Sequence, residues 1–160
     1  MKTDNAPVLC ANRMIAIAAA AAVWFGFAAD GALADATYSE PIESATNYTI
    51  SVANNAIDTY SGKITLTDGA KLIKTGAGTL ALTCGENEMD GGILLSAGKL
   101  RADAAGCLGT GKIVFDTTSN RQLIFNAAGA TFPNDIEQAA YYGVAWNVAV
   151  SDQPLVFGPR

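Results

Sequence analysis

The stretch from Lys71 to Ala102 reads KLIKTGAGTLALTCGENEMDGGILLSAGKLRA, and its recurring phrases decide the fold. Gly, then Lys or Thr, then an aliphatic residue opens a strand-like segment at four places: Gly62-Lys63-Ile64, Gly78-Thr79-Leu80, Gly98-Lys99-Leu100 and Gly111-Lys112-Ile113. The intervals between the glycines of successive copies are unequal, so each copy is one strand and not a whole repeat. A parallel β-helix stacks coils of about 20 residues that each contain two or three such strands.

The rest of the chain also predicts an all-β fold. Several short segments alternate apolar with polar residues, which is the period of a strand with one buried face. Gly, Asn and Asp separate these segments, as tight turns require. We expect strands at 48–52, 63–67, 79–83, 112–116, 122–126, 146–150 and 155–157, and mild helical character only at 134–142. The sequence therefore predicts a parallel β-helix, or β-solenoid, segment.

Composition excludes several classes of function. The chain has 160 residues, of which 50% are hydrophobic and 16% are charged, with a formal net charge of −5. It is too apolar for a disordered chain and too acidic for a nucleic-acid-binding surface. It contains no histidine, which removes Ser-His-Asp and Cys-His nucleophiles and the HExxH zinc site. We predict no catalytic residue, no cofactor and no metal.

Two motifs resemble ligand sites only superficially. The Gly-rich loop from Lys74 to Thr79 lacks the order of a phosphate-binding loop and no helix pattern follows it, so we expect a turn and no bound nucleotide. Glu86, Glu88 and Asp90 alternate within one turn, a spacing at which carboxylates bind Ca²⁺ weakly. The series of GGxGxD phrases that builds a calcium-binding β-helix is missing, so we favour a solvated acidic loop.

Residues 1–34 have the pattern of a helical secretory signal peptide. Lys2 and Arg13 precede the uncharged run from Met14 to Ala29, and Ala32-Leu33-Ala34 is a small-x-small exit motif. The alternative is a membrane anchor, but this run spans only about 24 Å as a helix, short of the ~30 Å hydrocarbon core. We predict cleavage between Ala34 and Asp35, export of the chain, and one domain over residues 35–160.

Two cysteines, Cys84 and Cys107, remain after the predicted cleavage. An oxidising compartment permits a disulfide between them. The interval between them is close to the length of one coil, and adjacent strands bring Cα atoms within the range of a disulfide. We expect a Cys84–Cys107 disulfide, worth about 3 kcal/mol by chain entropy. Two inert thiols are the alternative.

The segment 71–102 resembles the autotransporter-associated β-strand repeat of bacterial proteins. That repeat has an aliphatic residue, Lys and Gly-x-Gly-Thr-Leu-x-Leu, then an Asn-containing turn, Gly-Gly and a second strand with Gly-x-Leu. The matching residues are Leu72, Lys74, Gly76, Gly78, Thr79, Leu80, Leu82, Asn87, Gly91, Gly92, Ile93, Gly98 and Leu100. A looser match extends to most of 62–160. The turn from Cys84 to Asp90 is more acidic than is usual in the family, and Cys84 stands where Ser is common.

The resemblance implies a non-enzymatic structural module of an autotransporter passenger. It implies export through the periplasm to the extracellular side or the bacterial cell surface. It also implies adhesion over an extended surface, with glycans or proteins of a host or cell surface as partners. Further passenger repeats and an outer-membrane barrel are expected downstream if the chain is a fragment. Two alternatives stay open: a carbohydrate-active enzyme with paired carboxylates on one outer face, and a small secreted binding module.

Overall fold

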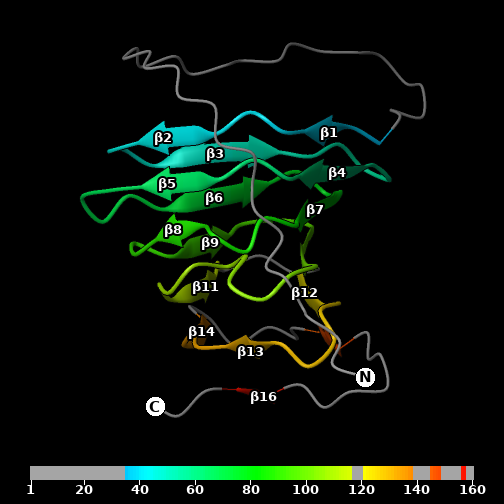
Figure 1. The fold of residues 1–160 in the computed structure, drawn as a ribbon. Coiled ribbons are helices and arrows are strands. Elements are labelled where there is room, and N and C mark those ends of the chain that lie inside the picture. The colour runs from blue at the N-terminus through cyan, green and yellow to red at the C-terminus, as the bar shows by residue number, and fades with distance from the viewer. Residues whose placement is uncertain (1–34, 117–120, 139–144, 149–155, 158–160) are drawn as a thin grey trace, which may run out of the picture.

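A computed structural model of the chain describes residues 35–116, 121–138, 145–148 and 156–157. Every regular element in this part is a β-strand, and every strand pair in it is parallel (Figure 1). The all-β, parallel β-solenoid prediction is therefore confirmed. The predicted signal peptide, including Ala34, lies outside the described residues. No described residue belongs to a helix that is long and apolar enough to cross a membrane.

Three sheets form the walls of the solenoid. Sheet A contains β1 (Thr37–Tyr38), β4 (Ile57–Tyr60), β7 (Thr79–Leu82), β10 (Lys99–Ala102), β12 (Gln122–Phe125) and β15 (Ala145–Val148). Sheet B contains β2 (Ile42–Ser44), β5 (Ile64–Leu66) and β8 (Glu88–Met89). Sheet C contains β3 (Tyr48–Ser51), β6 (Leu72–Thr75), β9 (Ile93–Leu95), β11 (Ile113–Phe115) and β14 (Ile136–Gln138). A separate pair joins β13 (Thr131–Phe132) to β16 (Val156–Phe157).

The register of sheet A gives the length of each coil. Successive strands pair Thr37 with Thr59, Ile57 with Thr79, Thr79 with Lys99, and Lys99 with Gln122. The coil length therefore varies slightly along the stack. It stays close to the value of about 20 residues expected of a parallel β-helix. Residues at equal positions in neighbouring coils lie about 4.8 Å apart along the stack.

The hydrophobic core is a column inside the walls. Leu80, Leu100 and Leu123 are paired in register on sheet A and are fully buried. Ile93 and Ile113 are likewise paired in register on sheet C and are fully buried. Because strand residues alternate between faces, the buried positions point inward and their neighbours point outward. Burial of each Leu or Ile side chain contributes roughly 1.5–3 kcal/mol before the entropy cost is subtracted.

Glycine is required where neighbouring corners touch. Gly98 has a φ of 69°, and a Cβ there would overlap the carbonyl oxygens of Gly76 and Gly78 in the preceding coil. Gly91 and Gly111 are equally constrained by backbone atoms of the coil before them. A side chain at any of these positions would push two coils apart, which explains the glycines of the repeated phrase.

The Gly-Lys copies open strands in different walls: the copy at Gly62 opens β5 in sheet B, that at Gly98 opens β10 in sheet A, and that at Gly111 opens β11 in sheet C. The phrase therefore marks a corner. The structure corrects one expectation about local structure. The mild helical character expected at 134–142 is wrong where this segment is described, because Ile136–Gln138 forms β14 and pairs with β11.

Candidate functional site

The outer face of sheet A carries a line of polar side chains in register. Along one line of this face, Ser61, Thr83, Asp103 and Asn126 follow one another at the ends of β4, β7, β10 and β12. Their backbone N–H groups donate to the coil before, which continues each ladder past the end of its strand. We call these four residues the polar column. It runs along the stack with one side chain per coil.

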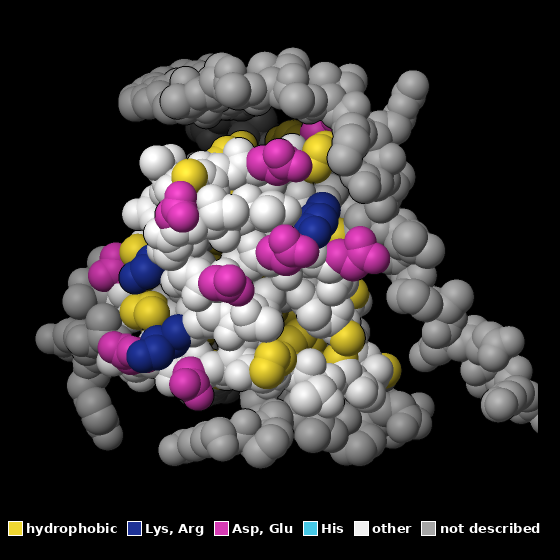
Figure 2. Space-filling model, turned by 60° about the vertical axis from the view of Figure 1, so that its left-hand side comes forward, with side chains coloured by type: hydrophobic (Ala, Val, Ile, Leu, Met, Phe, Trp, Pro, Cys, Tyr) yellow, Lys and Arg dark blue, Asp and Glu magenta, His cyan; other side chains and the backbone are white. Residues whose placement is uncertain are grey.

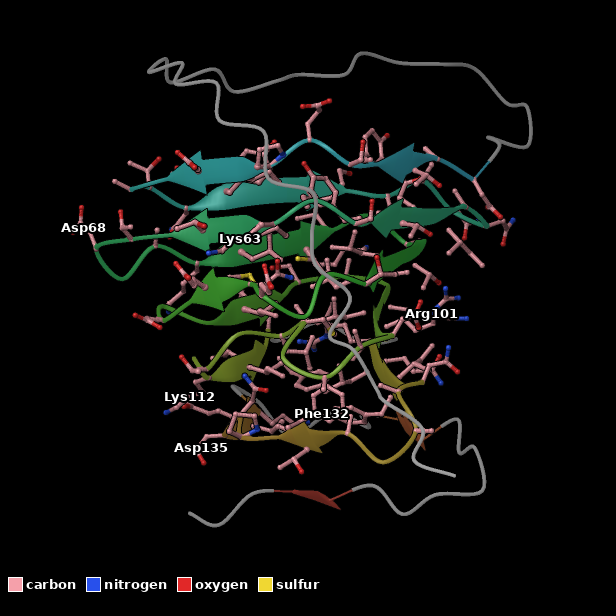
Figure 3. All side chains as sticks on the ribbon, viewed as in Figure 1. Lys63, Asp68, Arg101, Lys112, Phe132 and Asp135 are labelled. Atoms are coloured by element: carbon pink, nitrogen blue, oxygen red, sulfur yellow. The ribbon has the colours of Figure 1, made fainter. Side chains whose placement is uncertain are left out.

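Arg101, Asp103 and Asn126 form a hydrogen-bonded cluster within this face. The Nε and Nη2 atoms of Arg101 donate to the Asp103 carboxylate at 2.8 to 3.0 Å. Asn126 Nδ2 donates to Oδ1 of the same carboxylate at 3.0 Å. The side chains of Arg101 and Asp103 are only 27% and 14% exposed, and Arg101 projects from the wall of sheet A in Figure 3. A partly buried bidentate pair is held more firmly than an exposed one.

The sequence gives only a faint signal of this cluster. Arg101 and Asp103 are two residues apart, so they share a face of one strand. Asn126 joins them because β10 and β12 pair Lys99 with Gln122, and the same register places Asn126 level with Asp103. The sequence alone assigns no site to these residues, because it does not define the coil length at this point.

The two hydroxyl groups of the polar column donate hydrogen bonds to backbone carbonyls of the preceding coil. Ser61 Oγ donates to the carbonyl of Tyr38 at 3.1 Å, and Thr83 Oγ1 donates to the carbonyl of Tyr60 at 3.2 Å. Each hydroxyl oxygen keeps its lone pairs for an acceptor role. The column therefore offers acceptors, while Lys99 and Arg101 beside it offer donors.

The acidic turn on sheet B does not gather its carboxylates. Glu88 forms an ion pair with Lys63 at 2.6 Å, and Asp90 accepts a hydrogen bond from Thr110 Oγ1 at 3.0 Å. No cluster of three metal-ligating side chains occurs among the described residues. The side of the molecule drawn in Figure 2 carries more acidic than basic side chains, which are spread apart. The turn thus has the geometry of a solvated acidic edge.

The expected Cys84–Cys107 disulfide is absent, because Cys107 is a buried free thiol. Its pKa is raised to about 12, mainly by burial. In this coil Thr79 pairs with Lys99, and that register places Cys84 level with Ala104. Asn87 is the residue level with Cys107, and its Nδ2 donates to the Cys107 carbonyl at 2.8 Å. The interval between the two cysteines is thus longer than the coil that separates them.

Buried polar side chains tie the corners of neighbouring coils. Lys74 Nζ donates to the carbonyls of Thr75, Gly76 and Ala97 at 2.5, 2.8 and 3.3 Å. Asn87 accepts from the Ile64 N–H at 2.8 Å while it donates to Cys107. Asn134 Nδ2 donates to three carbonyls of the preceding coil, at Leu108, Gly109 and Gly111. Each side chain satisfies corner backbone groups that the strand ladders leave unpaired.

Lys74 is unusual because it occupies a position of the aliphatic column. It pairs in register with Ile50 on one side and Leu95 on the other and is fully buried. Burial lowers its pKa from 10.5 to about 8, and the negative charge of Asp58 offsets part of that effect. The Gly-rich loop that follows is a corner bound by this ammonium group, which agrees with the predicted turn between strands.

The outer face of sheet C is more apolar. Ile73, Leu94 and Val114 pair in register and are half-buried. Next to them Lys112 forms an ion pair with Glu137 at 2.7 Å, which raises the pKa of the lysine and lowers that of the glutamate. Lys112, Asp135, Ile136 and Glu137 line a shallow hollow of about 430 Å³. The charged groups of Lys112 and Glu137 satisfy each other, and Asp135, the third charged residue of the hollow, is exposed.

Comparison of the chain with family models, with curated proteins and with solved structures gives no match. The fold is therefore established from the structure alone. The resemblance to the autotransporter-associated repeat stays a prediction from the residues quoted above.

Proposed function

We propose that the chain is a non-enzymatic scaffold module of an exported, surface-displayed protein, of the kind that the autotransporter-associated repeat implies. The observation that supports this role is what the repeat residues do. Leu72, Leu80 and Leu82 fill the buried column, and Lys74 and Asn87 tie corners. These residues hold successive coils together, so the repeat motif serves to build an extended wall.

The outer wall of sheet A favours binding over hydrolysis. Glycoside hydrolysis needs two carboxylates placed on either side of a bond, about 5 to 10 Å apart. The outward positions of β4, β7, β10 and β12, with the corner residues that follow them, hold one carboxylate, that of Asp103. That carboxylate already accepts hydrogen bonds from Arg101 and Asn126, so its oxygens are engaged within the protein.

Export is tested by expressing the full chain with a C-terminal tag in a bacterium that has an outer membrane. We expect the mature protein outside the cytoplasm with Asp35 as its first residue, read by N-terminal sequencing. The Ala34→Tyr variant should remain an uncleaved precursor, because the exit motif needs a small residue there. An unprocessed cytoplasmic wild-type chain would contradict the proposal.

Surface display is a separate measurement on the same material. When the chain is fused to an outer-membrane barrel, an antibody raised against residues 35–160 should bind to intact cells. Retention inside the periplasm with a correctly folded domain would contradict the surface role while leaving export intact.

A further inference from the structure

We propose that the side chain of Asp35 caps the N-terminal end of sheet A, so that the processed chain is closed at its first residue. The inference rests on the proposed export for the place of cleavage, whereas the capping contact itself joins two described residues. It is drawn from the hydrogen-bond register of sheet A, from the contact of Asp35 with Ile57, and from the position of Asp35 directly after the predicted exit motif.

The ladder of sheet A follows one rule from coil to coil. The N–H of the first residue in a strand donates to the carbonyl of the residue that precedes its register partner. Thr79 pairs with Ile57 and donates to the Ala56 carbonyl at 2.9 Å. Lys99 pairs with Thr79 and donates to the Gly78 carbonyl at 3.0 Å. Each strand therefore depends on one residue further back than the pair itself.

Applied to β4, this rule leaves Ile57 without a backbone acceptor in the processed chain. The pairing of Thr37 with Thr59 places Asp35 level with Ile57, so the rule calls for the carbonyl of Ala34. Cleavage between Ala34 and Asp35 would separate that carbonyl from the folded part of the chain. Ile57 is half-buried, and a backbone N–H that lacks a partner in such a position lowers the stability of the fold.

The carboxylate of Asp35 supplies the acceptor that the processed backbone lacks. Its Oδ1 atom accepts the Ile57 N–H at 2.9 Å, the length of the regular ladder bonds. The next two N–H groups along this edge, of Thr59 and Ser61, donate to backbone carbonyls of the first coil at 2.7 and 2.8 Å. The step from β1 to β4, at one end of the stack in Figure 1, is therefore complete with residues from Asp35 onward. An aspartate that caps the first turn of a helix satisfies backbone N–H groups in the same way.

Asp35 is the one carboxylate of the first coil that makes such a contact. Glu40 and Glu43 are the other two, and both residues are exposed. Within the described part of the chain, neither of their carboxylates accepts a hydrogen bond, whereas that of Asp35 accepts one from the next coil. Glu43 therefore offers a matched control, because it carries the same charge in the same coil without a partner.

The test measures hydrogen exchange of the Ile57 amide by NMR in the processed chain that the export experiment yields. Asp35→Ala removes the acceptor, Asp35→Asn keeps an oxygen acceptor without the charge, and Glu43→Ala removes a charge that caps nothing. We expect the Ile57 amide to exchange roughly three- to tenfold faster in Asp35→Ala, as the loss of one hydrogen bond predicts. In Asp35→Asn and Glu43→Ala, its exchange should stay within about twofold of the wild type. The Lys99 amide, which lies further along the stack, should exchange equally in all four proteins and so shows that the fold is retained.

Three outcomes would overturn the cap. The first is unchanged exchange of the Ile57 amide in Asp35→Ala, and the second is exchange in Asp35→Asn that is as fast as in Asp35→Ala. The third is faster exchange at Ile57 in the processed wild type than in the uncleaved Ala34→Tyr precursor, because the cap should make the preceding residues dispensable. If the wild-type chain is not processed at all, the proposed function fails, and the same variants of the full chain still test the contact between Asp35 and Ile57. Failure of the cap is therefore distinguishable from failure of the proposed function.

Discussion

At the scale of the residue, Lys74 shows a charged group used as a structural tie inside an apolar column. Its ammonium binds three corner carbonyls but loses the solvation of water, so its pKa falls to about 8. Below that pH, both folded and unfolded chains carry the proton. Between about pH 8 and the ordinary lysine pKa of 10.5, the unfolded chain binds more protons than the folded one. The free energy of unfolding should therefore rise with pH through this window.

The contribution of Lys74 is isolated by comparison with Lys74→Met, a side chain of similar length without a charge. Cys107, whose pKa is raised to about 12, opposes the rise above about pH 9, and it does so equally in both proteins. In urea unfolding at pH 7 and pH 9.5, we expect the wild type to gain stability relative to Lys74→Met. A difference between the two proteins that is the same at both pH values would show that Lys74 does not lose its proton in this range.

At the scale of the element, an inward position on a central strand is intolerant of charge. Leu80 and Leu82 on β7 both point into the column and are fully buried. Leu80→Asp would bury an unpaired carboxylate between Leu100 and the preceding coil, at a cost of several kcal/mol. We expect this variant to be unfolded at 25 °C by circular dichroism.

Glu88→Ala is the matched control on the outside of β8, where loss of the exposed ion pair with Lys63 should cost about 1 kcal/mol or less. If Leu80→Asp unfolded cooperatively at the same urea midpoint as the wild type, the inward orientation of the Leu80 side chain would be contradicted.

Elements are predicted from the sequence where their residues alternate between apolar and polar, and they are missed where a polar residue takes an inward position, as Lys74 does in β6. Strands such as β5, β7 and β12 are predicted because three or four alternating residues define one. β1, β8 and β13 contain two residues each and have no period to detect. The Arg101–Asp103–Asn126 cluster and the absent Cys84–Cys107 disulfide depend on the length of the local coil, which differs between the β7–β10 step and the β10–β12 step. That length is set by how many residues each corner holds, which hydrophobic patterning leaves undetermined.

At the scale of the whole molecule, a solenoid has neighbours only along its axis, so its stability is built from contacts between successive coils. The coil of β7 has a coil on either side in sheet A and every residue of this strand is buried, whereas β4 is mostly half-buried and packs against the two-residue β1. Hydrogen exchange followed by mass spectrometry should therefore show slower exchange in β7 and β10 than in β4. The Thr59 N–H is a stringent reporter of this difference. Its hydrogen bond to the Ala36 carbonyl, at 2.7 Å, is no longer than that of the Lys99 N–H to the Gly78 carbonyl, at 3.0 Å. Faster exchange at Thr59 would therefore reflect the lower burial of its coil and not a weaker hydrogen bond. Equal protection of Thr59 and Lys99 would mean that all coils open together, and the stack would then behave as one cooperative unit despite its linear construction.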